Sequence, residues 1–317
     1  MTRSFANKRV LLTGASGFIG SALCQRLVTD GALVHAVYRN ACVDWLPRIE
    51  LHQADLSDYE ATRHAFAAAK PDLVFHLAGH SNAMPRIQEV RPALASNLVA
   101  TVNLLTAAAE IGCERIVVTG SHDEPDPNEA SADAFVPSSP YAASKLAANL
   151  YARMLHALYQ LPVSVARIYM AYGVGRTNLN KLVPHVILSV LRGQPPRLSS
   201  GTRPMDWIYI DDVIAGLLAI AQSRRLGGQT VGLGTGITHT SRQVAEKIIA
   251  LMGSELTPEF GAIADRPLEK ARFCDMSDTR AKIDWSPVVS FDEGLRRSIV
   301  WYRDVAANAA SPASAHT

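Results

Sequence analysis

Residues 10–20 read Val10-Leu-Leu-Thr-Gly-Ala-Ser-Gly-Phe-Ile-Gly20 and place three glycines between an apolar run and a helical pattern. We expect Gly14 to allow a tight turn, Gly17 to let the backbone approach a pyrophosphate, and Gly20 to let the helix pack closely on the strand. The N–H groups and the positive dipole end of that helix would face the phosphates. The alternative is that the glycines serve only a tight turn, but the strand–turn–helix context favours dinucleotide binding.

Further short apolar runs, rich in Val, Ile and Leu, follow this turn through the first half of the chain. They are too continuous to be half-exposed, which is typical of a parallel sheet buried on both faces. Their alternation with helical patterns predicts an α/β fold with a doubly wound parallel Rossmann sheet. The predicted strands are Arg9–Thr13, Leu33–Tyr38, Leu73–Leu77, Arg115–Thr119 and Val163–Ile168. The predicted helices are Phe18–Thr29, Asp58–Ala69, Pro92–Ile111 and Pro140–Gln160.

The pattern loosens after about residue 170, where prolines separate shorter helices such as Asp211–Gln222 and Ser241–Met252. We therefore predict a Rossmann domain over 1–170 and a smaller C-terminal mixed α/β lobe, mainly for substrate, over 171–304. Residues 305–317 are mostly Ala and Ser, with one Pro, one Asn and one His, and are expected to form a flexible tail. Segment Asp123–Pro140 holds four prolines and five acidic residues, which indicates a loop, either a functional lid or a plain surface excursion.

Composition excludes several classes of protein. The 317 residues are 48% hydrophobic and 19% charged, which suits a large core in two packed lobes. A net charge of +2 indicates no nucleic-acid partner. Four cysteines stand far apart without a CxxC pair, so we expect no metal site and reduced thiols in a cytoplasmic protein. No signal-type segment precedes the first apolar run, and no stretch approaches a membrane span in length.

The end of the second strand bears on the choice of dinucleotide. An acidic residue there would bind the ribose 2′-OH of NAD, but the chain reads His35-Ala-Val-Tyr-Arg-Asn40. Arg39 would pair with a 2′-phosphate, which favours NADP, unless it is an ordinary solvated arginine. Asp55-Leu56 is expected to follow a third strand, for which no bounds are predicted, and to lie beside the adenine. An aspartate at this position is also an ordinary start of a helix.

Tyr141 and Lys145 lie four residues apart at the start of a predicted helix, on one face. A phenol with a pKa near 10 is a poor acid–base group at pH 7, and an ammonium one turn away together with an oxidised nicotinamide favours the phenolate. Ser121 comes just after the preceding strand, at the sheet edge where α/β proteins bind ligands. We therefore expect Ser121 to hold a reacting oxygen while Tyr141 transfers its proton.

With these placements the chain resembles the extended short-chain dehydrogenase/reductases, the NAD(P)-dependent nucleotide-sugar epimerase/dehydratase/reductase family, from about residue 8 to 303. Further matching pieces are His76-Leu-Ala-Gly79, Asn97-Leu-Val-Ala-Thr101, Asp206-Trp-Ile-Tyr-Ile-Asp-Asp212 and Trp285-Ser-Pro287. The resemblance implies Ser121, Tyr141 and Lys145 as catalytic residues, Lys145 also as ribose anchor, and Arg203 and Arg266 as substrate-binding candidates. It implies a cofactor site that includes Gly14, Gly17, Phe18, Ile19, Gly20, Arg39, Asn40, Asp55, Leu56, Leu77, Ala78, Gly79 and Asn97 besides Tyr141 and Lys145. It also implies a homodimer packed through Pro92–Ile111 and Pro140–Gln160.

The sequence departs from the family pattern near the substrate. Met205 and Met170 stand where the family commonly has Arg and Asn, which bears on the identity of the substrate. Sugar 4,6-dehydratases of the family read Thr-Asp-Glu where this chain has Ser121-His122-Asp123, so half of that acid–base set is absent. Asp123 and Glu124 are read as loop carboxylates, with Asp123 as a secondary acid the alternative, and His122 as a loop histidine.

Three functions follow from this pattern. The main expectation is an NADPH-dependent reductase of a 4-keto or 4-keto-6-deoxy nucleotide sugar, supported by Arg39 and the missing dehydratase carboxylate. The alternative is an epimerase or dehydratase that oxidises and re-reduces its nucleotide sugar on a retained NAD. The third is a non-enzymatic dinucleotide sensor, against which the complete Ser/Tyr/Lys set stands.

Overall fold

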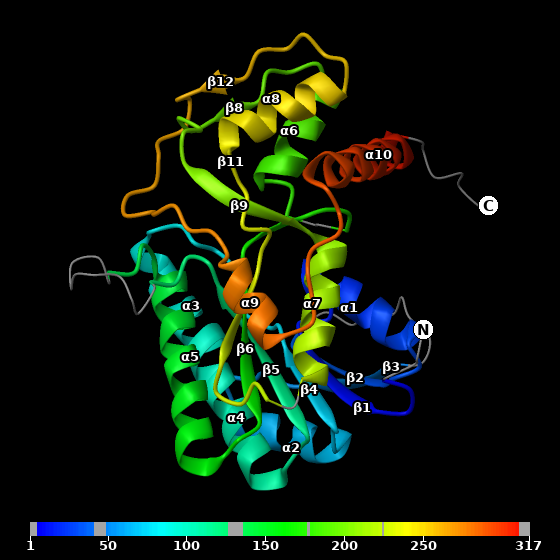
Figure 1. Cartoon of the computed structure of the whole chain (residues 1–317), viewed down its shortest axis with the longest axis vertical. Coiled ribbons are helices and arrows are strands. Elements are labelled where there is room, and N and C mark those ends of the chain that lie inside the picture. Colours follow the sequence, from blue (N-terminus) through cyan, green and yellow to red (C-terminus); the bar gives the residue numbers. More distant parts are fainter. Residues whose placement is uncertain (1–4, 41–48, 126–135, 176–177, 224, 311–317) are drawn as a thin grey trace.

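The fold is built around a seven-stranded parallel sheet in the order β10-β6-β5-β4-β1-β2-β3. The computed structural model describes residues 5–40, 49–125, 136–175, 178–223 and 225–310. The strands of the sheet are β1 Arg9–Thr13, β2 Leu33–Tyr38, β3 Ile49–Gln53, β4 Leu73–His76, β5 Arg115–Ser121, β6 Val163–Ile168 and β10 Thr230–Leu233. The order reverses between β1 and β4, so the doubly wound Rossmann fold is confirmed (Figure 1).

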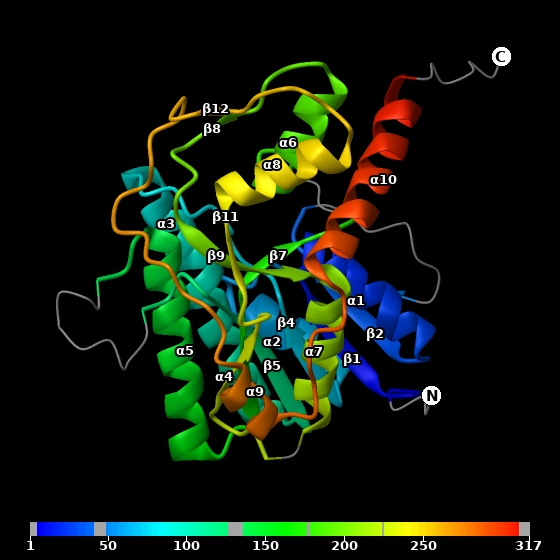
Figure 2. The ribbon, with the colours of Figure 1, turned by 45° about the horizontal axis from the view of Figure 1, so that its top comes forward.

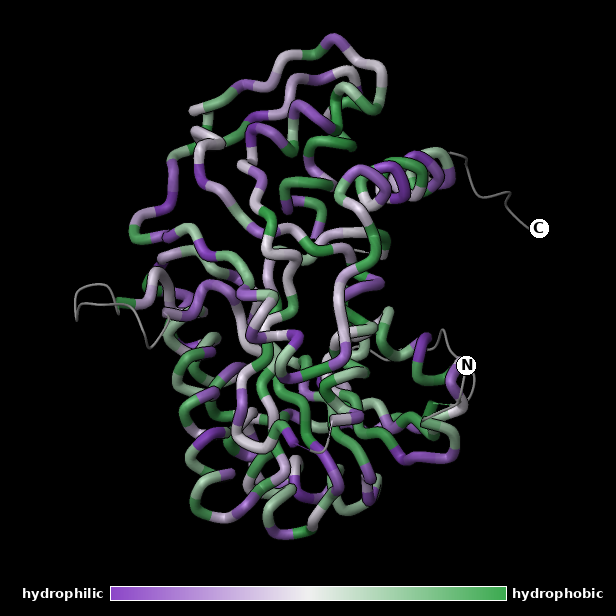
Figure 3. The backbone as a smooth tube through the Cα atoms, viewed as in Figure 1, coloured by the Kyte–Doolittle hydropathy of each residue, from purple (hydrophilic) through white to green (hydrophobic). Residues whose placement is uncertain are grey.

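Helices cover both faces of this sheet, as its uninterrupted apolar strands require. They are α1 Phe18–Thr29, α2 Tyr59–Ala69, α4 Ala100–Ile111, α5 Pro140–Tyr159, α7 Ile210–Gln222 and the short α9 Met276–Lys282. Val10 and Leu12 belong to the cluster that includes α1 and α7, whereas Leu11 packs with α2, α4 and α5. Alternate residues of β1, β2, β4, β5 and β6 thus fill two separate core layers. Figure 3 shows the central strands mainly hydrophobic and the turns between elements mainly hydrophilic.

A second lobe lies over the carboxyl ends of the strands (Figures 1 and 2). Its two small sheets have the orders β11-β9-β7 and β12-β8, and helices α6, α8 and α10 pack around them. Their bounds are β7 Met170–Tyr172, β8 Arg197–Leu198, β9 Pro204–Tyr209, β11 Thr238–Thr240, β12 Glu259–Phe260, α6 Leu182–Leu191, α8 Ser241–Leu251 and α10 Phe291–Ala310. The first of these sheets mixes parallel and antiparallel pairs, as expected for a mixed α/β lobe.

The chain crosses between the lobes more often than a division at residue 170 implies. α7 packs against α1 and the sheet, β10 pairs with β6 at the edge of the sheet, and α9 packs on β10. These elements lie within 171–304, but they complete the Rossmann layers. The predicted tail at 305–317 begins too early, because α10 continues to Ala310; residues 311–317 lie outside the described residues. Most of the predicted loop at 123–140 also lies outside them, as does Cys42.

The helix expected over 92–111 begins earlier and is irregular. A 3₁₀ turn η1 at Ile87–Glu89, α3 at Val90–Ala93 and a π-helical stretch η2 at Leu94–Val99 lead directly into α4. The segment Ile87–Ile111 is long and apolar enough, by length and composition alone, to cross a membrane. The expectation that no stretch approaches that length was therefore wrong. Its apolar character has a local cause, because α4 packs on α2 and α5 while η2 packs on α5.

Candidate functional site

The glycine turn between β1 and α1 has the geometry expected of a phosphate-binding turn. Gly14 has a φ of +75°, and a Cβ there would lie 2.6 Å from the backbone nitrogen of Ala78. A Cβ on Gly20 would lie 1.9 Å from the carbonyl oxygen of Gly14, so α1 packs against the turn itself. No side chain fits at either position, so an anion can approach the backbone of the turn and the N-terminal end of α1 closely.

A cavity lies beside this turn, where the sequence predicts the adenosine moiety of the cofactor. Arg39, Asp55 and Leu56 line it, together with Gly14, Gly17, Leu77, Ala78 and Gly79. Hydrogen bonds from the backbone and hydroxyl of Ser57 lower the pKa of Asp55, and the guanidinium of Arg39 lowers it further. Arg39 and Asp55 are therefore near neighbours of opposite charge in the cavity predicted to bind the ribose and adenine.

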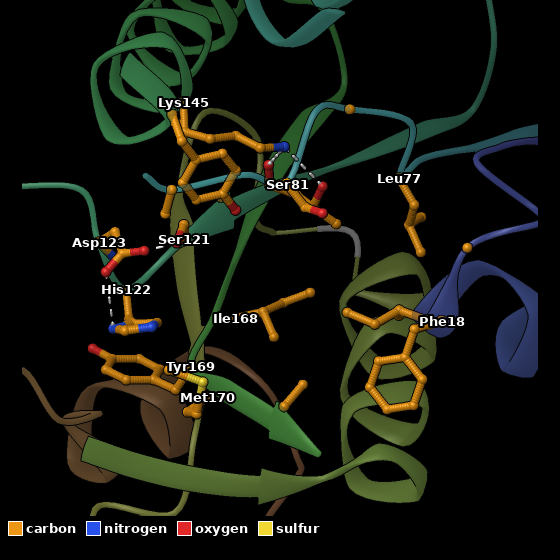
Figure 4. A pocket seen from close by; sticks show the side chains of 18 of the residues that line it. Phe18, Leu77, Ser81, Ser121, His122, Asp123, Lys145, Ile168, Tyr169 and Met170 are labelled. Atoms are coloured by element: carbon orange, nitrogen blue, oxygen red, sulfur yellow. Dashed lines mark hydrogen bonds and ion pairs between the residues drawn. The ribbon is translucent and has the colours of Figure 1, made fainter. Parts of the chain in front are cut away.

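Ser121, Tyr141 and Lys145 line a second cavity, which shares Gly14, Gly17 and Gly79 with the first and also contacts Phe18, Ile19 and Gly20. Ser121 is the last residue of β5, and Tyr141 and Lys145 lie in the first two turns of α5. The helix begins here because the side chain of Ser139 caps the N–H of Ala142 and Pro140 occupies its first position. Figure 4 shows Ser121 and Lys145 beside the cavity, with Phe18 and Leu77 across from them.

Burial sets the protonation of this group. It raises the pKa of Tyr141 above its usual value of 10, and the carboxylates of Asp123 and Glu124 raise it further, while a hydrogen bond with Ser121 lowers it. Burial also lowers the pKa of Lys145 to about 8. The Lys145 ammonium donates to the carbonyl oxygen of Thr119 at 2.8 Å. In this structure the neutral phenol of Tyr141 is therefore favoured near neutral pH, and a positive charge brought beside it would favour the phenolate.

The three residues after Ser121 have different surroundings. His122 is buried, its ring is stacked on Tyr169, and burial lowers its pKa, which keeps the imidazole neutral. Asp123 lines the catalytic cavity, and its backbone N–H donates to the Ser121 hydroxyl at 3.1 Å (Figure 4). Glu124 faces away into the protein and is fully buried. Of the two acidic residues, only Asp123 is placed to meet a substrate.

Glu124 forms a buried polar cluster behind Ser121. Its carboxylate accepts the backbone N–H of Ser121 at 2.5 Å and the side-chain amide of Asn149. A guanidinium nitrogen of Arg167 lies 4.0 Å from the same carboxylate. The cluster fixes the backbone that carries the Ser121 hydroxyl.

Arg203 and Arg266, the two predicted substrate residues, reach the cavity from the second lobe. Both are paired with one carboxylate, because Arg203 lies 3.2 Å from one oxygen of Glu269 and Arg266 donates to the other at 3.2 Å. The three residues also line a neighbouring cavity between α6 and β8. They therefore connect the catalytic cavity to a groove in the second lobe.

Two predicted cofactor residues lie elsewhere. Asn40 is exposed after β2 and does not line either Rossmann cavity in the described structure. Asn97 is fully buried, and its amide bonds the backbone N–H and carbonyl of His80 and the hydroxyl of Ser144. It therefore joins the loop after β4 to α5 instead of reaching the cavity.

Sequence reasoning did not identify three residues of the site. His80 lines the catalytic cavity and bonds Glu89 at 2.5 Å, Glu269 holds the arginine pair, and Glu124 supports Ser121. His80 had a signal, since it directly follows the predicted strand end and Gly79. Glu269 had none, because its partners depend on how the second lobe folds.

A phosphate turn that leads into a cavity with serine, tyrosine and lysine defines a nicotinamide-dinucleotide-dependent oxidoreductase. The model of the NAD dependent epimerase/dehydratase family matches residues 10–234, and the chain belongs to this family, within the extended short-chain dehydrogenase/reductases.

Its relatives carry out related reactions on nucleotide sugars. The chain is 30% identical to a dTDP-glucose 4,6-dehydratase of Neisseria gonorrhoeae, over 94% of this chain and 96% of the relative. It is 29% identical to a UDP-glucose 4-epimerase of Mycolicibacterium smegmatis, over 93% and 99%. Among solved structures it resembles the Bordetella bronchiseptica enzyme WbmF in complex with NADH, with 26% identity, a TM-score of 0.83 and coverage of 97% and 95%.

Proposed function

We propose that the protein is a nucleotide-sugar 4-epimerase that oxidises and re-reduces its substrate on a dinucleotide it retains. The observation that carries this proposal is the Ser121–Tyr141–Lys145 group beside one cavity, without a second acid at position 122. The relatives named above are an epimerase and a dehydratase, which favours a retained cofactor over the NADPH-dependent reductase expected from the sequence. The reductase interpretation rested on Arg39 and on that missing carboxylate, and an epimerase needs no such carboxylate either.

The chain supplies binding and proton transfer, and a bound nicotinamide dinucleotide supplies the hydride acceptor and donor. The absence of room for a Cβ at Gly14 and Gly20 suits a backbone cradle for the pyrophosphate. Tyr141 would accept the proton of the C4 hydroxyl and return it to the reduced product. Ser121 would hold the same oxygen, and Lys145 would favour the phenolate and bind the ribose.

Position 122 supports epimerisation over dehydration. Loss of water from C6 needs an acid for the leaving hydroxyl and a base for the neighbouring proton, and the dehydratase pattern places carboxylates at both positions after the hydroxyl residue. Here His122 is neutral, buried and stacked on Tyr169. Asp123 alone favours the second candidate, a 4,6-dehydratase, because its carboxylate lines the cavity and is close enough to raise the pKa of Tyr141.

The cofactor is proposed to be NAD, in line with the solved relative that holds NADH. Arg39 favours NADP instead, since its guanidinium lines the adenosine cavity. Asp55 opposes that preference, because its charge competes with a 2′-phosphate for the same guanidinium. The substrate is proposed to be a nucleotide sugar whose diphosphate meets Arg203 and Arg266.

The test has two steps. The freshly purified protein is denatured and the released nucleotide is identified by mass spectrometry; stoichiometric NAD or NADP supports retention, whereas a protein that only consumes added NADPH does not. The protein is then incubated with UDP-glucose and with dTDP-glucose. A product of unchanged mass with altered C4 configuration by NMR supports epimerisation, and a product lighter by one water identifies a dehydratase. Tyr141→Phe is the inactive control, and Tyr151→Phe, on the exposed side of the same helix, is its matched active control.

A homodimer is also proposed, through α5 and the adjacent segment that precedes α4. Apolar side chains are exposed on both, and η1, α3 and η2 all contact α5. Those exposed on α5 are Leu150, Tyr151, Met154, Leu158 and Tyr159, and those on the other segment are Ile87, Val90 and Leu94. Sedimentation of the wild type as a dimer, and of a Leu150→Glu/Met154→Glu variant as a folded monomer, would agree with this; an unchanged mass in the variant would not. A cytoplasmic location stays a prediction.

A further inference from the structure

Three side chains that bind transition metals meet on one face of the sheet, at its edge and away from the catalytic cavity. His35 lies on β2, and Glu50 and His52 lie on the edge strand β3. The two strands are parallel, with His35 paired to Glu50 in register. Glu50 and His52 are two residues apart and therefore point to the same side as His35. The register of the sheet itself brings the three residues together.

Their potential ligand atoms are spaced as a metal site requires. Nδ1 of His35 lies 3.0 Å from Nε2 of His52. Oxygens of Glu50 lie 3.5 Å from the first nitrogen and 3.6 Å from the second. Tetrahedral zinc with bonds of about 2.0 Å separates its ligand atoms by about 3.3 Å. These separations lie close to that value, with Oε2 of Glu50 nearest His35 and Oε1 nearest His52, and one ligand atom from each residue falls within 4.8 Å of the others.

We propose that His35, Glu50 and His52 bind a divalent transition cation such as Zn²⁺, with water as the fourth ligand. The two imidazoles are nearly buried, and the Glu50 side chain is 63% exposed, which gives solvent access for the ion and the water.

A plain hydrogen bond is the competing account of this contact. Two neutral imidazoles share one proton in such a bond, and the 3.0 Å separation also suits it. A hydrogen-bonded pair, however, does not need the Glu50 carboxylate at nearly equal distances from both nitrogens. A bound cation would be coordinated by all three groups at once, and it would stabilise the pairing of the edge strand β3 with β2. Zinc affinity and its dependence on Glu50 therefore separate the two accounts.

The experiment measures Zn²⁺ binding to the full-length protein. Metal-free protein is titrated with Zn²⁺ in competition with a chromophoric chelator, and thermal unfolding is recorded with and without Zn²⁺. The expected result is one Zn²⁺ per chain at this site, a raised melting temperature, and binding at least tenfold weaker in Glu50→Gln and in His52→Gln. His64→Gln, which removes an exposed histidine on α2, should bind as the wild type does.

Two results would overturn the proposal. One is the absence of binding at Zn²⁺ concentrations well above that of the protein. The other is binding that neither Glu50→Gln nor His52→Gln weakens. Glu50 is largely exposed, so its variant should fold even if His52→Gln does not. Binding of Co²⁺ with the strong visible absorption of four-coordinate cobalt in the wild type, lost in Glu50→Gln, would assign the geometry as well as the site.

Discussion

Glu124→Gln tests how the protein interior controls the catalytic group. The side chain keeps its shape, and its remaining oxygen can still accept the Ser121 N–H, but the negative charge disappears. The Glu124 carboxylate lies 4.0 Å from Arg167 and accepts two hydrogen bonds in a fully buried position. Burial raises its pKa, and the Arg167 guanidinium and these hydrogen bonds oppose that rise by favouring the charged form. Hydrogen bonds to a charged group contribute about 1.5–3 kcal/mol each, and breaking a buried ion pair costs about 3–5 kcal/mol. Because one acceptor survives, we expect the free energy of unfolding to fall by about 2–4 kcal/mol.

The same change should move the pH dependence of activity in one direction. The charge of Glu124 raises the pKa of both Tyr141 and Lys145. In the proposed mechanism, activity needs the Tyr141 phenolate, which is gained as pH rises, and the Lys145 ammonium, which is lost as pH rises through about 8. Removing the negative charge lowers both pKa values. Both limbs of the profile of kcat/KM against pH should therefore shift to lower pH.

The assay compares the wild type with Glu124→Gln and with Glu114→Gln. Glu114 also bonds a cation, Lys8 at 2.6 Å, but its side chain is 58% exposed. Its variant should lose less than about 1 kcal/mol of unfolding free energy in urea and keep the pH profile unchanged. The reasoning is refuted if Glu124→Gln lowers kcat/KM without moving either limb, because Glu124 would then be structural only. It is also refuted if the two variants lose equal stability.

Four further substitutions test other parts of the site. Tyr141→Phe should lower kcat by about 10²–10⁴-fold with little change in KM, measured as the rate of C4 epimer formation by NMR, because it removes the proton acceptor. Gly20→Ala should destabilise the protein by about 3 kcal/mol or more in urea unfolding, because its Cβ would lie 1.9 Å from the carbonyl oxygen of Gly14. Arg39→Ala should weaken binding of NADP at least about tenfold more than binding of NAD in a fluorescence titration, since only NADP carries the charge that the guanidinium meets. Glu269→Gln should tighten binding of UDP by about two- to fivefold in calorimetry, because the carboxylate no longer competes for Arg203 and Arg266.

Each of these has a result that contradicts it. A Tyr141→Phe enzyme within tenfold of the wild type would remove the phenol from the mechanism, and Gly20→Ala with wild-type stability would mean that the turn can open. Equal losses of affinity for NADP and for NAD in Arg39→Ala would show that Arg39 does not contact the 2′-phosphate. Weaker UDP binding in Glu269→Gln would show that Glu269 holds the arginines in place instead of competing with the ligand.

Local patterns were sufficient for most of the Rossmann core. β1, β2, β6 and α1 have the predicted bounds, because each combines a continuous apolar run or stripe with a clear end such as the glycine turn. β3 and β10 lacked predicted bounds for a physical reason. β3 is a half-exposed edge strand with polar residues at Glu50 and His52, and β10 is a four-residue strand defined by its pairing with β6. The crossing of the chain between the lobes depends on such strand pairing, and no local sequence pattern predicts it.

The residues of the site also divide into those that local patterns place and those that only the packing of the chain places. Tyr141 and Lys145 share a helix, and the glycine turn is contiguous, so their relations follow from helical and turn geometry. Glu124 was read as a loop carboxylate because it follows Ser121 in a segment rich in proline and acid. The structure buries it, since the chain turns back after β5 and Asn149 approaches from two turns along α5. A sequence pattern places a residue on an element, but which neighbours neutralise it depends on packing.

Position 122 shows why the choice between epimerase and dehydratase does not reduce to one missing residue. The backbone N–H of His122 donates to the carbonyl oxygen of Ile168, and its ring is stacked on Tyr169 at 6.0 Å between centroids. An aspartate there would leave a void beside Tyr169 and place a carboxylate in a nearly buried position, which raises its pKa. His122→Asp alone should therefore destabilise the protein and not produce dehydration. Asp123 supplies one carboxylate in the cavity, so dehydration by this chain would need a second acid–base group from a position other than 122. Epimerisation needs neither protonation of a leaving hydroxyl nor removal of the neighbouring carbon-bound proton. This smaller set of proton transfers is the physical basis for preferring it.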